Sequence, residues 1–130
     1  MTTEAIGTFE VKLAPLSIEE PTLGRMSIDK VFSGALTGTS KGEMLTAASV
    51  VKGSAGYVAV ERVTGTLDGR SGTFSLMHMG IMNRGAPQLS ITVVPDSGTA
   101  GLDGLSGSMT IDRSDGKHAY GFTYALPEAR

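Results

Sequence analysis

The chain has 130 residues, of which 40% are hydrophobic and 18% are charged, a balance typical of one folded globular domain. The net charge is −2, no two Lys or Arg residues are adjacent, and cysteine is absent, so we expect no nucleic-acid partner, no disulfide and no thiol chemistry. With only two histidines and no cysteine, the chain offers few metal ligands, so no metal site is predicted, and no cofactor is expected. The acidic, polar start and the lack of a stretch of about 20 apolar residues predict a cytoplasmic protein without a membrane partner.

Short β-type segments follow one another along the whole chain, and no segment shows a sustained apolar period of 3.6 residues. A short helical turn is expected only near residues 17–20. Glycine is frequent, with 18 residues, and most glycines fall between the segments, as in tight turns. In chain order, strands are predicted over residues 4–14, 25–37, 42–52, 55–66, 72–83, 88–95, 105–113 and 117–126. Long strands with internal glycines predict an all-β fold, an eight-stranded antiparallel closed barrel forming a single domain over residues 1–130.

Turn residues set the boundaries between these strands. Gly38 and residues 40–42 are expected to separate the second strand from the third. Asp68-Gly69 and Asp115-Gly116 predict two-residue hairpin turns, because Asp and Gly tolerate the positive φ angles of a type I′ turn. Each of these two turns fixes the register of the strands on either side of it.

The Asp68-Gly69 turn places a mixed set of side chains on one face of its hairpin. It pairs Ala59 with His78 and Glu61 with Leu76. The same face carries Tyr57, Val63, Phe74 and Gly80. We expect this face to point into the barrel. The opposite face carries Val58, Val60, Met77 and Met79, and because it is also apolar, we expect another subunit to cover it. The converse assignment of the two faces is the alternative.

The Asp115-Gly116 turn gives the last hairpin an aromatic face. It pairs Met109 with Phe122, Ile111 with Tyr120 and Gly107 with Tyr124. Arg113 would then face His118 beside the turn, where both side chains are expected at the surface. The aromatic face is predicted to be interior.

Glu61 and His78 are the main candidates for chemistry. Burial in an apolar interior raises the pKa of a carboxyl group, and such a group beside an imidazole can transfer protons at neutral pH. Tyr57 is the expected hydrogen-bond donor, so the predicted catalytic residues are Glu61, His78 and Tyr57. The alternatives are a structural pair that joins two strands, and a solvent-exposed Glu61.

A predicted ligand pocket surrounds these groups. Its expected lining residues are Met44, Phe74, Leu76, Met109, Tyr120, Phe122 and Tyr124. Ordinary core packing is the alternative for the methionines. Lys30, Glu43 and Arg62 could anchor a ligand, although a surface ion pair is the favoured explanation for each of them.

Four motifs in this order resemble a bacterial family. They are YVAVE at residues 57–61, GRSGTF at 69–74 with His78, VPDSGT at 94–99 and GKHAY at 116–120. The chain is similar to the family of domains of unknown function numbered 3224, whose members look like the allene oxide cyclase barrel. The resemblance implies an eight-stranded barrel and a homo-oligomer. It implies no assigned activity, although allene oxide cyclases use a buried glutamate.

The leading hypothesis is a barrel that binds a small, largely apolar molecule and performs cyclase, isomerase or lyase chemistry with Glu61. Confinement of the ligand and proton transfer would drive the reaction. A non-catalytic, lipocalin-like binding or carrier barrel is the second hypothesis. A structural oligomer with a filled barrel is the third, and it predicts that the structure has no pocket.

Overall fold

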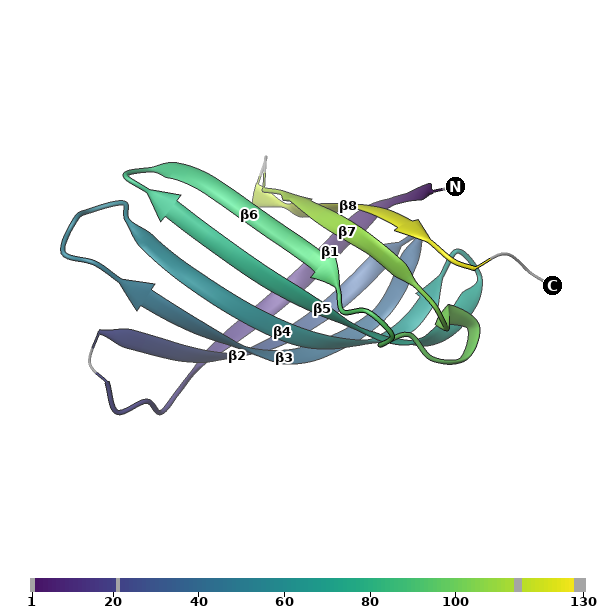
Figure 1. Cartoon of the computed structure of the whole chain (residues 1–130), viewed down its shortest axis with the longest axis horizontal. Helices are drawn as coiled ribbons and strands as arrows, with labels where there is room; N and C mark the ends of the chain where they lie inside the picture. Colours follow the sequence, from purple (N-terminus) through teal and green to yellow (C-terminus); the bar gives the residue numbers. More distant parts are fainter. Residues whose placement is uncertain (1, 21, 114–115, 128–130) are drawn as a thin grey trace.

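Eight antiparallel strands close into one barrel in sequence order in the computed structural model, which describes residues 2–20, 22–113 and 116–127 (Figure 1). The strands are β1 (Thr3–Leu16), β2 (Leu23–Gly34), β3 (Leu36–Ala48), β4 (Ala55–Leu67), β5 (Arg70–Asn83), β6 (Ala86–Val93), β7 (Ser106–Asp112) and β8 (His118–Ala125). β1 pairs with β8, which closes the barrel and leaves no sheet edge unpaired along that seam. The predicted all-β, eight-stranded closed barrel is confirmed.

The β4–β5 hairpin has the predicted register. Asp68 and Gly69 have positive φ angles of 47° and 86°, and Leu67 pairs with Arg70. Ala59 consequently pairs with His78, and both side chains are buried. The face with Glu61 and His78 therefore points into the barrel, as predicted, and the Val and Met face points outward.

The predicted boundary between the second and third strands is wrong. The chain turns at Gly34, whose φ is 109°, and β3 runs without interruption through Gly38 and Gly42. These two glycines allow close approach to β4, because a Cβ on Gly38 would lie 2.6 Å from the Cα of Gly65. A Cβ on Gly42 would lie 2.6 Å from the Cα of Glu61. Glycines inside a strand here permit curvature and close packing, and they do not end the strand.

Residues 17–20 form no helical turn, contrary to the sequence-based expectation. A 3₁₀ turn, η1 (Ala100–Leu102), lies instead between β6 and β7. The segment around it crosses one end of the barrel and inserts Leu102 and Leu105, both buried in the core. Backbone hydrogen bonds from Val94 to Ser75 and from Thr99 to Thr73 hold the segment against β5.

The β7–β8 hairpin also has the predicted register. Met109 pairs with Phe122 and Ile111 with Tyr120, and the aromatic side chains of β8 are buried. Asp115, half of the predicted turn, lies outside the described residues. In the part of the chain that the structure describes, no helix is long and apolar enough to cross a membrane.

The interior of the barrel has two unlike halves. The half beneath η1 is packed with side chains, the largest of which are completely buried: Phe74, Phe122, Leu36, Leu67, Leu76, Leu102 and Leu105. Stacking of Phe74 on Phe122, with ring centroids 5.9 Å apart, contributes to this packing. The other half contains a cavity, so the interior as a whole is not filled.

Candidate functional site

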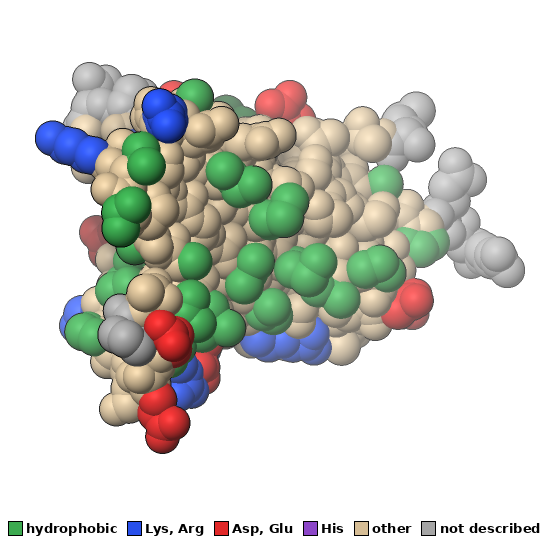
Figure 2. Space-filling model, turned by 60° about the vertical axis from the view of Figure 1, so that its left-hand side comes forward, with side chains coloured by type: hydrophobic (Ala, Val, Ile, Leu, Met, Phe, Trp, Pro, Cys, Tyr) green, Lys and Arg blue, Asp and Glu red, His purple; other side chains and the backbone are tan. Residues whose placement is uncertain are grey.

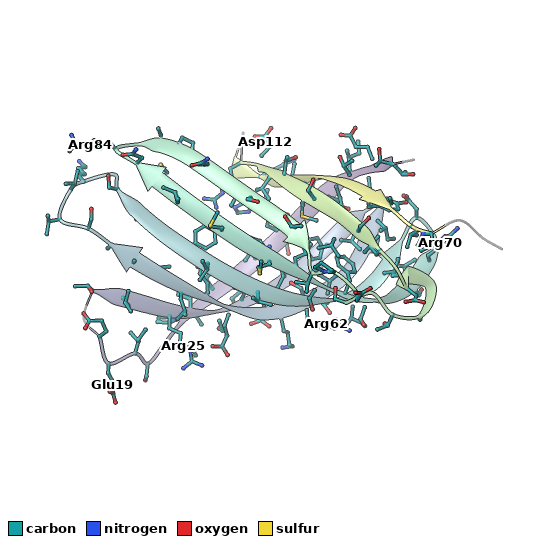
Figure 3. All side chains as sticks on the ribbon, viewed as in Figure 1. Glu19, Arg25, Arg62, Arg70, Arg84 and Asp112 are labelled. Atoms are coloured by element: carbon teal, nitrogen blue, oxygen red, sulfur yellow. The ribbon has the colours of Figure 1, made fainter. Side chains whose placement is uncertain are left out.

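A cavity of about 860 Å³ occupies the half of the barrel away from η1. Mostly apolar side chains line it, among them Ile28, Met44, Tyr57 and Leu89. The cavity extends to Met82 and Pro87, next to the β5–β6 turn that carries Arg84 at one end of the molecule (Figure 3). Arg70, the first residue of β5, lies at the opposite end. A cavity of this size is within the range of small-molecule sites.

The seam between β6 and β7 lies along this cavity. Among their described residues, the two strands pair only at Ile91 with Met109 and at Thr92 with Ser108. The remaining parts of both strands separate, and residues from both sides of the gap, Leu89 and Ile111, line the cavity.

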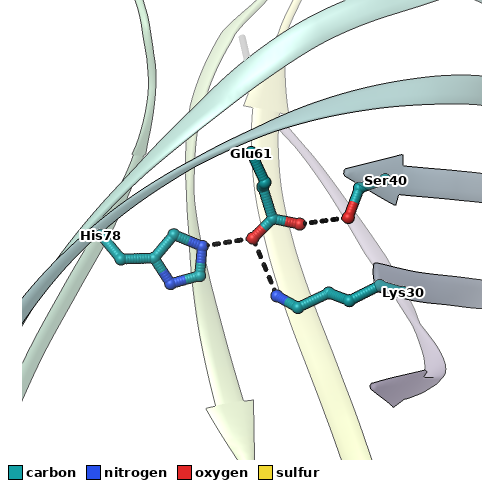
Figure 4. Close-up of polar contacts among 4 residues, drawn as sticks. All are labelled: Lys30, Ser40, Glu61 and His78. Carbon is teal, nitrogen blue, oxygen red and sulfur yellow. Dashed lines mark hydrogen bonds and ion pairs between the residues drawn. The ribbon is translucent and has the colours of Figure 1, made fainter. Parts of the chain in front are cut away.

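Four polar side chains meet below the cavity, one from each of β2, β3, β4 and β5 (Figure 4). Lys30 Nζ lies 2.8 Å from Glu61 Oε2, and His78 Nε2 lies 2.5 Å from the same oxygen. Ser40 Oγ donates to Glu61 Oε1 over 2.7 Å. All four residues are buried. The register predicted for Glu61 and His78 therefore brings them into contact.

The pKa of Glu61 is shifted in the direction opposite to the sequence-based expectation. Burial raises it, but hydrogen bonds from His78 and Lys30 and the charge of Lys30 outweigh burial and lower the pKa from 4.5 to about 2. Glu61 is therefore a permanent carboxylate at neutral pH. It does not line the cavity. The prediction of a carboxyl group with a raised pKa is wrong, because Lys30 was not expected beside it.

The carboxylate determines which nitrogen of His78 carries the proton. An ionised Glu61 can only accept, so Nε2 of a neutral imidazole donates to it and Nδ1 keeps a free lone pair. No hydrogen bond joins Nδ1 to any described residue. Among the described residues, every buried side-chain nitrogen or oxygen has a hydrogen-bond partner, so Nδ1, which has none, is not itself buried. Because His78 lines the cavity, Nδ1 is accessible from it. Figure 4 shows this second nitrogen directed away from Glu61.

Lys30, the cationic member of the cluster, also lines the cavity. Its ammonium lies 4.9 Å from the ring centroid of Phe9 and 5.8 Å from that of Phe32, in addition to its ion pair with Glu61. These aromatic faces favour the cation. Lys30 and Glu61 neutralise each other, so a neutral His78 leaves the cluster without net charge in the low-dielectric interior.

Three of the predicted site residues line the cavity. His78 lies at its base, and Tyr57 and Met44 are in its wall. The ring of Tyr57 is 6.4 Å from that of His78, and no hydrogen bond joins Tyr57 to Glu61 among the described residues. Burial raises the pKa of Tyr57, although the positive charge of Arg113 opposes the shift.

The other predicted lining residues lie in the filled half of the barrel. They are buried in the core and do not line the cavity: Phe74, Leu76, Met109, Tyr120, Phe122 and Tyr124. Tyr120 accepts a hydrogen bond from the Leu36 amide and makes others with backbone carbonyls, which gives it a structural role. The aromatic face is therefore interior, as predicted, but it is packing and not cavity wall.

Sequence reasoning missed Lys30 and Ser40 as members of the cluster, and it placed His118 at the surface. Ser40 was expected in a turn, and Lys30 was grouped with Glu43, which instead pairs with Arg25 at the surface. The signal for Lys30 was present, because Ile28, Lys30 and Phe32 alternate on one face. The expectation of a surface position for His118 is also wrong, because it stacks on Phe9 at 5.0 Å and lines the cavity.

The fold and site together define an all-β barrel with a half-open apolar interior and one buried ionic cluster. Within the described residues, no three His, Cys, Asp or Glu side chains are grouped so as to hold a metal ion. Comparison with the sequence model described as "Protein of unknown function (DUF3224)" gives a match over residues 5–124. The chain belongs to this family.

A solved structure supports the membership. The chain is similar to a protein of unknown function from the DUF3224 family of Shewanella oneidensis MR-1, with 46% sequence identity and a TM-score of 0.94. The alignment covers 99% of this chain and 100% of that one. No curated protein matches the chain.

Proposed function

We propose that the barrel binds a small, largely apolar molecule that carries a carbonyl group and catalyses proton transfer within it, as an isomerase, cyclase or lyase. One observation carries the proposal. His78 lies at the base of a mostly apolar cavity with one ring nitrogen bonded to a buried carboxylate and the other accessible from the cavity. A carboxylate that orients an imidazole in this way is a recurrent arrangement for a general base.

The proposed step balances without a further reactant. Nδ1 of His78 removes a proton from the carbon next to the carbonyl group, and the C–H electrons form a carbon–carbon double bond. The carbonyl π electrons move to oxygen, where the ammonium of Lys30 stabilises the developing negative charge. In a β,γ-unsaturated carbonyl compound the anion formed is a dienolate. The imidazolium then gives the proton to the γ carbon, the carbonyl group forms again, the carbon–carbon double bond moves into conjugation, and the neutral imidazole is restored.

Glu61 acts as a positioning residue in this proposal. It holds the tautomer of His78 and stabilises the imidazolium, and it keeps Lys30 at the base of the cavity. This replaces the acid–base role expected for Glu61 from its sequence context. The likeness expected between members of this family and the allene oxide cyclase barrel is an analogy at the level of the fold, and it agrees with confined chemistry on an apolar substrate. The absence of cysteine agrees with a cytoplasmic location, which we also propose.

Deuterium exchange tests the catalytic proposal without knowledge of the natural substrate. The protein is incubated in D₂O with a panel of apolar ketones and enones, and deuterium uptake next to the carbonyl is followed by NMR. We expect enhanced uptake for at least one panel member and a loss of about 100-fold in His78→Gln. His118→Gln is the matched control, because His118 is the other histidine of the cavity, and it should keep most of the activity.

Equal activity in His78→Gln and the wild-type protein would eliminate the proton-transfer role. A non-catalytic carrier is the second candidate, and the size and apolar lining of the cavity favour it. Native mass spectrometry of protein purified from cells distinguishes the two. A stoichiometric ligand that is retained unchanged, together with no exchange across the panel, would indicate a carrier.

A further inference from the structure

The outer face of the barrel carries an apolar patch that no part of the chain covers within the described residues. Six side chains form it: Leu45 on β3, Val58 and Val60 on β4, and Met77, Met79 and Ile81 on β5. Each of them is between 46% and 56% exposed. We call this set the outer patch.

The strand registers make the outer patch continuous. Leu45 pairs with Val58, and Val58 pairs with Met79, so these three form one row across β3, β4 and β5. Val60 pairs with Met77 in the next row. Hydrophobic side chains gather on one face of the molecule with charged side chains at its edges (Figure 2).

The area of the outer patch is compatible with a dimer interface. Six half-exposed side chains of this size present roughly 500 Å² of apolar surface, at the upper end for the largest patch of a monomeric protein. A stable interface buries about 800 Å² on each partner. Ser90 and Thr92 continue the two rows on β6 and form part of a polar rim around the outer patch.

The charges at the edge of the outer patch favour a second copy of this chain as the occupant. Glu43 lies beside Val60 and is paired with Arg25, and Arg62 is the next outward residue of β4. Arg62 is held by Thr73, Ser75 and the carbonyl of Ser97. The edge therefore carries both signs of charge. In a two-fold dimer the same surface lies on both partners, so acidic and basic groups at its edge can face each other. A lipid surface, by contrast, attracts a rim that is mainly basic.

We propose that the outer patch is a self-association surface, through which two copies of this chain form a two-fold dimer. Of the six residues of the outer patch, only Ile81 also lines the cavity, and the patch excludes Lys30, Glu61 and His78. The proposal is therefore independent of the proposed catalytic function.

Sedimentation equilibrium of the wild-type protein at roughly 100 μM tests the proposal, with Val60→Lys as the disruptive variant. We expect a mass twice the 13.4 kDa of one chain for the wild type, and a dissociation constant at least about 10-fold higher for Val60→Lys. Val31→Lys is the matched control. Val31 is 51% exposed against 53% for Val60, and it faces outward on β2 outside the outer patch.

Circular dichroism of each variant establishes that it is folded, and Met77→Lys provides a second disruptive variant. A monomeric wild-type protein, or a dimer that Val60→Lys leaves intact, would overturn the proposal. A wild-type mass of three or more chains would overturn the two-fold arrangement. A monomer that floats with phosphatidylglycerol vesicles, and no longer does so as Val60→Lys, would assign the outer patch to a lipid surface instead.

Discussion

Glu61 combines deep burial with a lowered pKa, and the ion pair explains how. Burial alone would favour the neutral acid, but the hydrogen bonds from His78 and Lys30 and the charge of Lys30 stabilise the carboxylate more strongly. Lys30 depends on Glu61 in turn, because an unpaired ammonium in this position would be costly. At the scale of single residues, the cluster is therefore one interdependent unit, and removal of one partner affects the others.

Glu61→Gln should lower the free energy of unfolding by about 3 kcal/mol at neutral pH, because it leaves Lys30 buried without a counter-charge. The folded-state pKa of about 2 lies below the value of 4.5 for the free group, so this stabilisation is present above pH 4.5. It is lost as the pH falls toward 2. Urea unfolding of both proteins across this range, followed by circular dichroism, measures the difference.

The difference between the wild type and Glu61→Gln should accordingly narrow between pH 4.5 and 2. Lys30→Met combined with Glu61→Gln removes both charges and serves as the control. It should recover part of the lost stability at neutral pH. If the difference in the free energy of unfolding between the wild type and Glu61→Gln stays constant down to pH 2, the proposed stabilisation by the ion pair of Lys30 and Glu61 is contradicted.

Glycine placement controls how closely the strands approach one another. Gly42 lies opposite Glu61 in the β3–β4 pair, and both strands remain regular there. A methyl group on Gly42 would lie 2.1 Å from the Val60 carbonyl oxygen and 2.6 Å from the Cα of Glu61. Both obstacles are backbone atoms, so the two strands would have to move apart. At the level of the strands, Gly42 therefore allows β3 to lie close to β4 at the position of Glu61.

Gly42→Ala should therefore lower the free energy of unfolding by about 2 kcal/mol. Gly56→Ala is the matched control, because Gly56 is also inside a strand and its added Cβ would meet nothing closer than 3.7 Å. The control should differ from the wild type by less than about 1 kcal/mol, in the stabilising direction. Urea unfolding of both variants compares them, and equal effects would show that the close approach at Gly42 has no energetic importance.

In the whole molecule, one half of the barrel interior is a packed core and the other half contains the cavity. The half under η1 is densely packed around Phe122, which is completely buried, while Met44 lies in the wall of the cavity. Removing atoms from a packed core costs both the lost burial and the cavity left behind. Removing atoms from a cavity wall enlarges a space that already exists. The two halves should therefore respond differently to the same kind of substitution.

Phe122→Ala should lower the free energy of unfolding by about 4 kcal/mol, and Met44→Ala by about 1 kcal/mol. Thermal unfolding followed by circular dichroism ranks the two variants. Similar losses at both positions would indicate that the cavity half closes in solution and packs as tightly as the other half.

Local patterns in the sequence predict eight strands, a closed barrel and the registers of two hairpins correctly, although they misplace the boundary between β2 and β3. Turn residues such as Asp68-Gly69 act on their immediate neighbours, and the two-residue period of a strand carries their effect along it. The contact between Glu61 and His78 followed from this local rule, because the two residues lie on adjacent strands of one hairpin.

The remainder of the site depends on contacts between strands that are distant in the sequence. Lys30 and Ser40 reach Glu61 across sequence separations of 31 and 21 residues, and local rules placed the boundary between their strands at residues 38–42, whereas the chain turns at Gly34. The division into filled and hollow halves depends on η1, which inserts Leu102 and Leu105 into one end. Packing of segments distant in the sequence fixes both features, and with them the charge state of Glu61, because the pKa of a buried group depends on every neighbour that surrounds it.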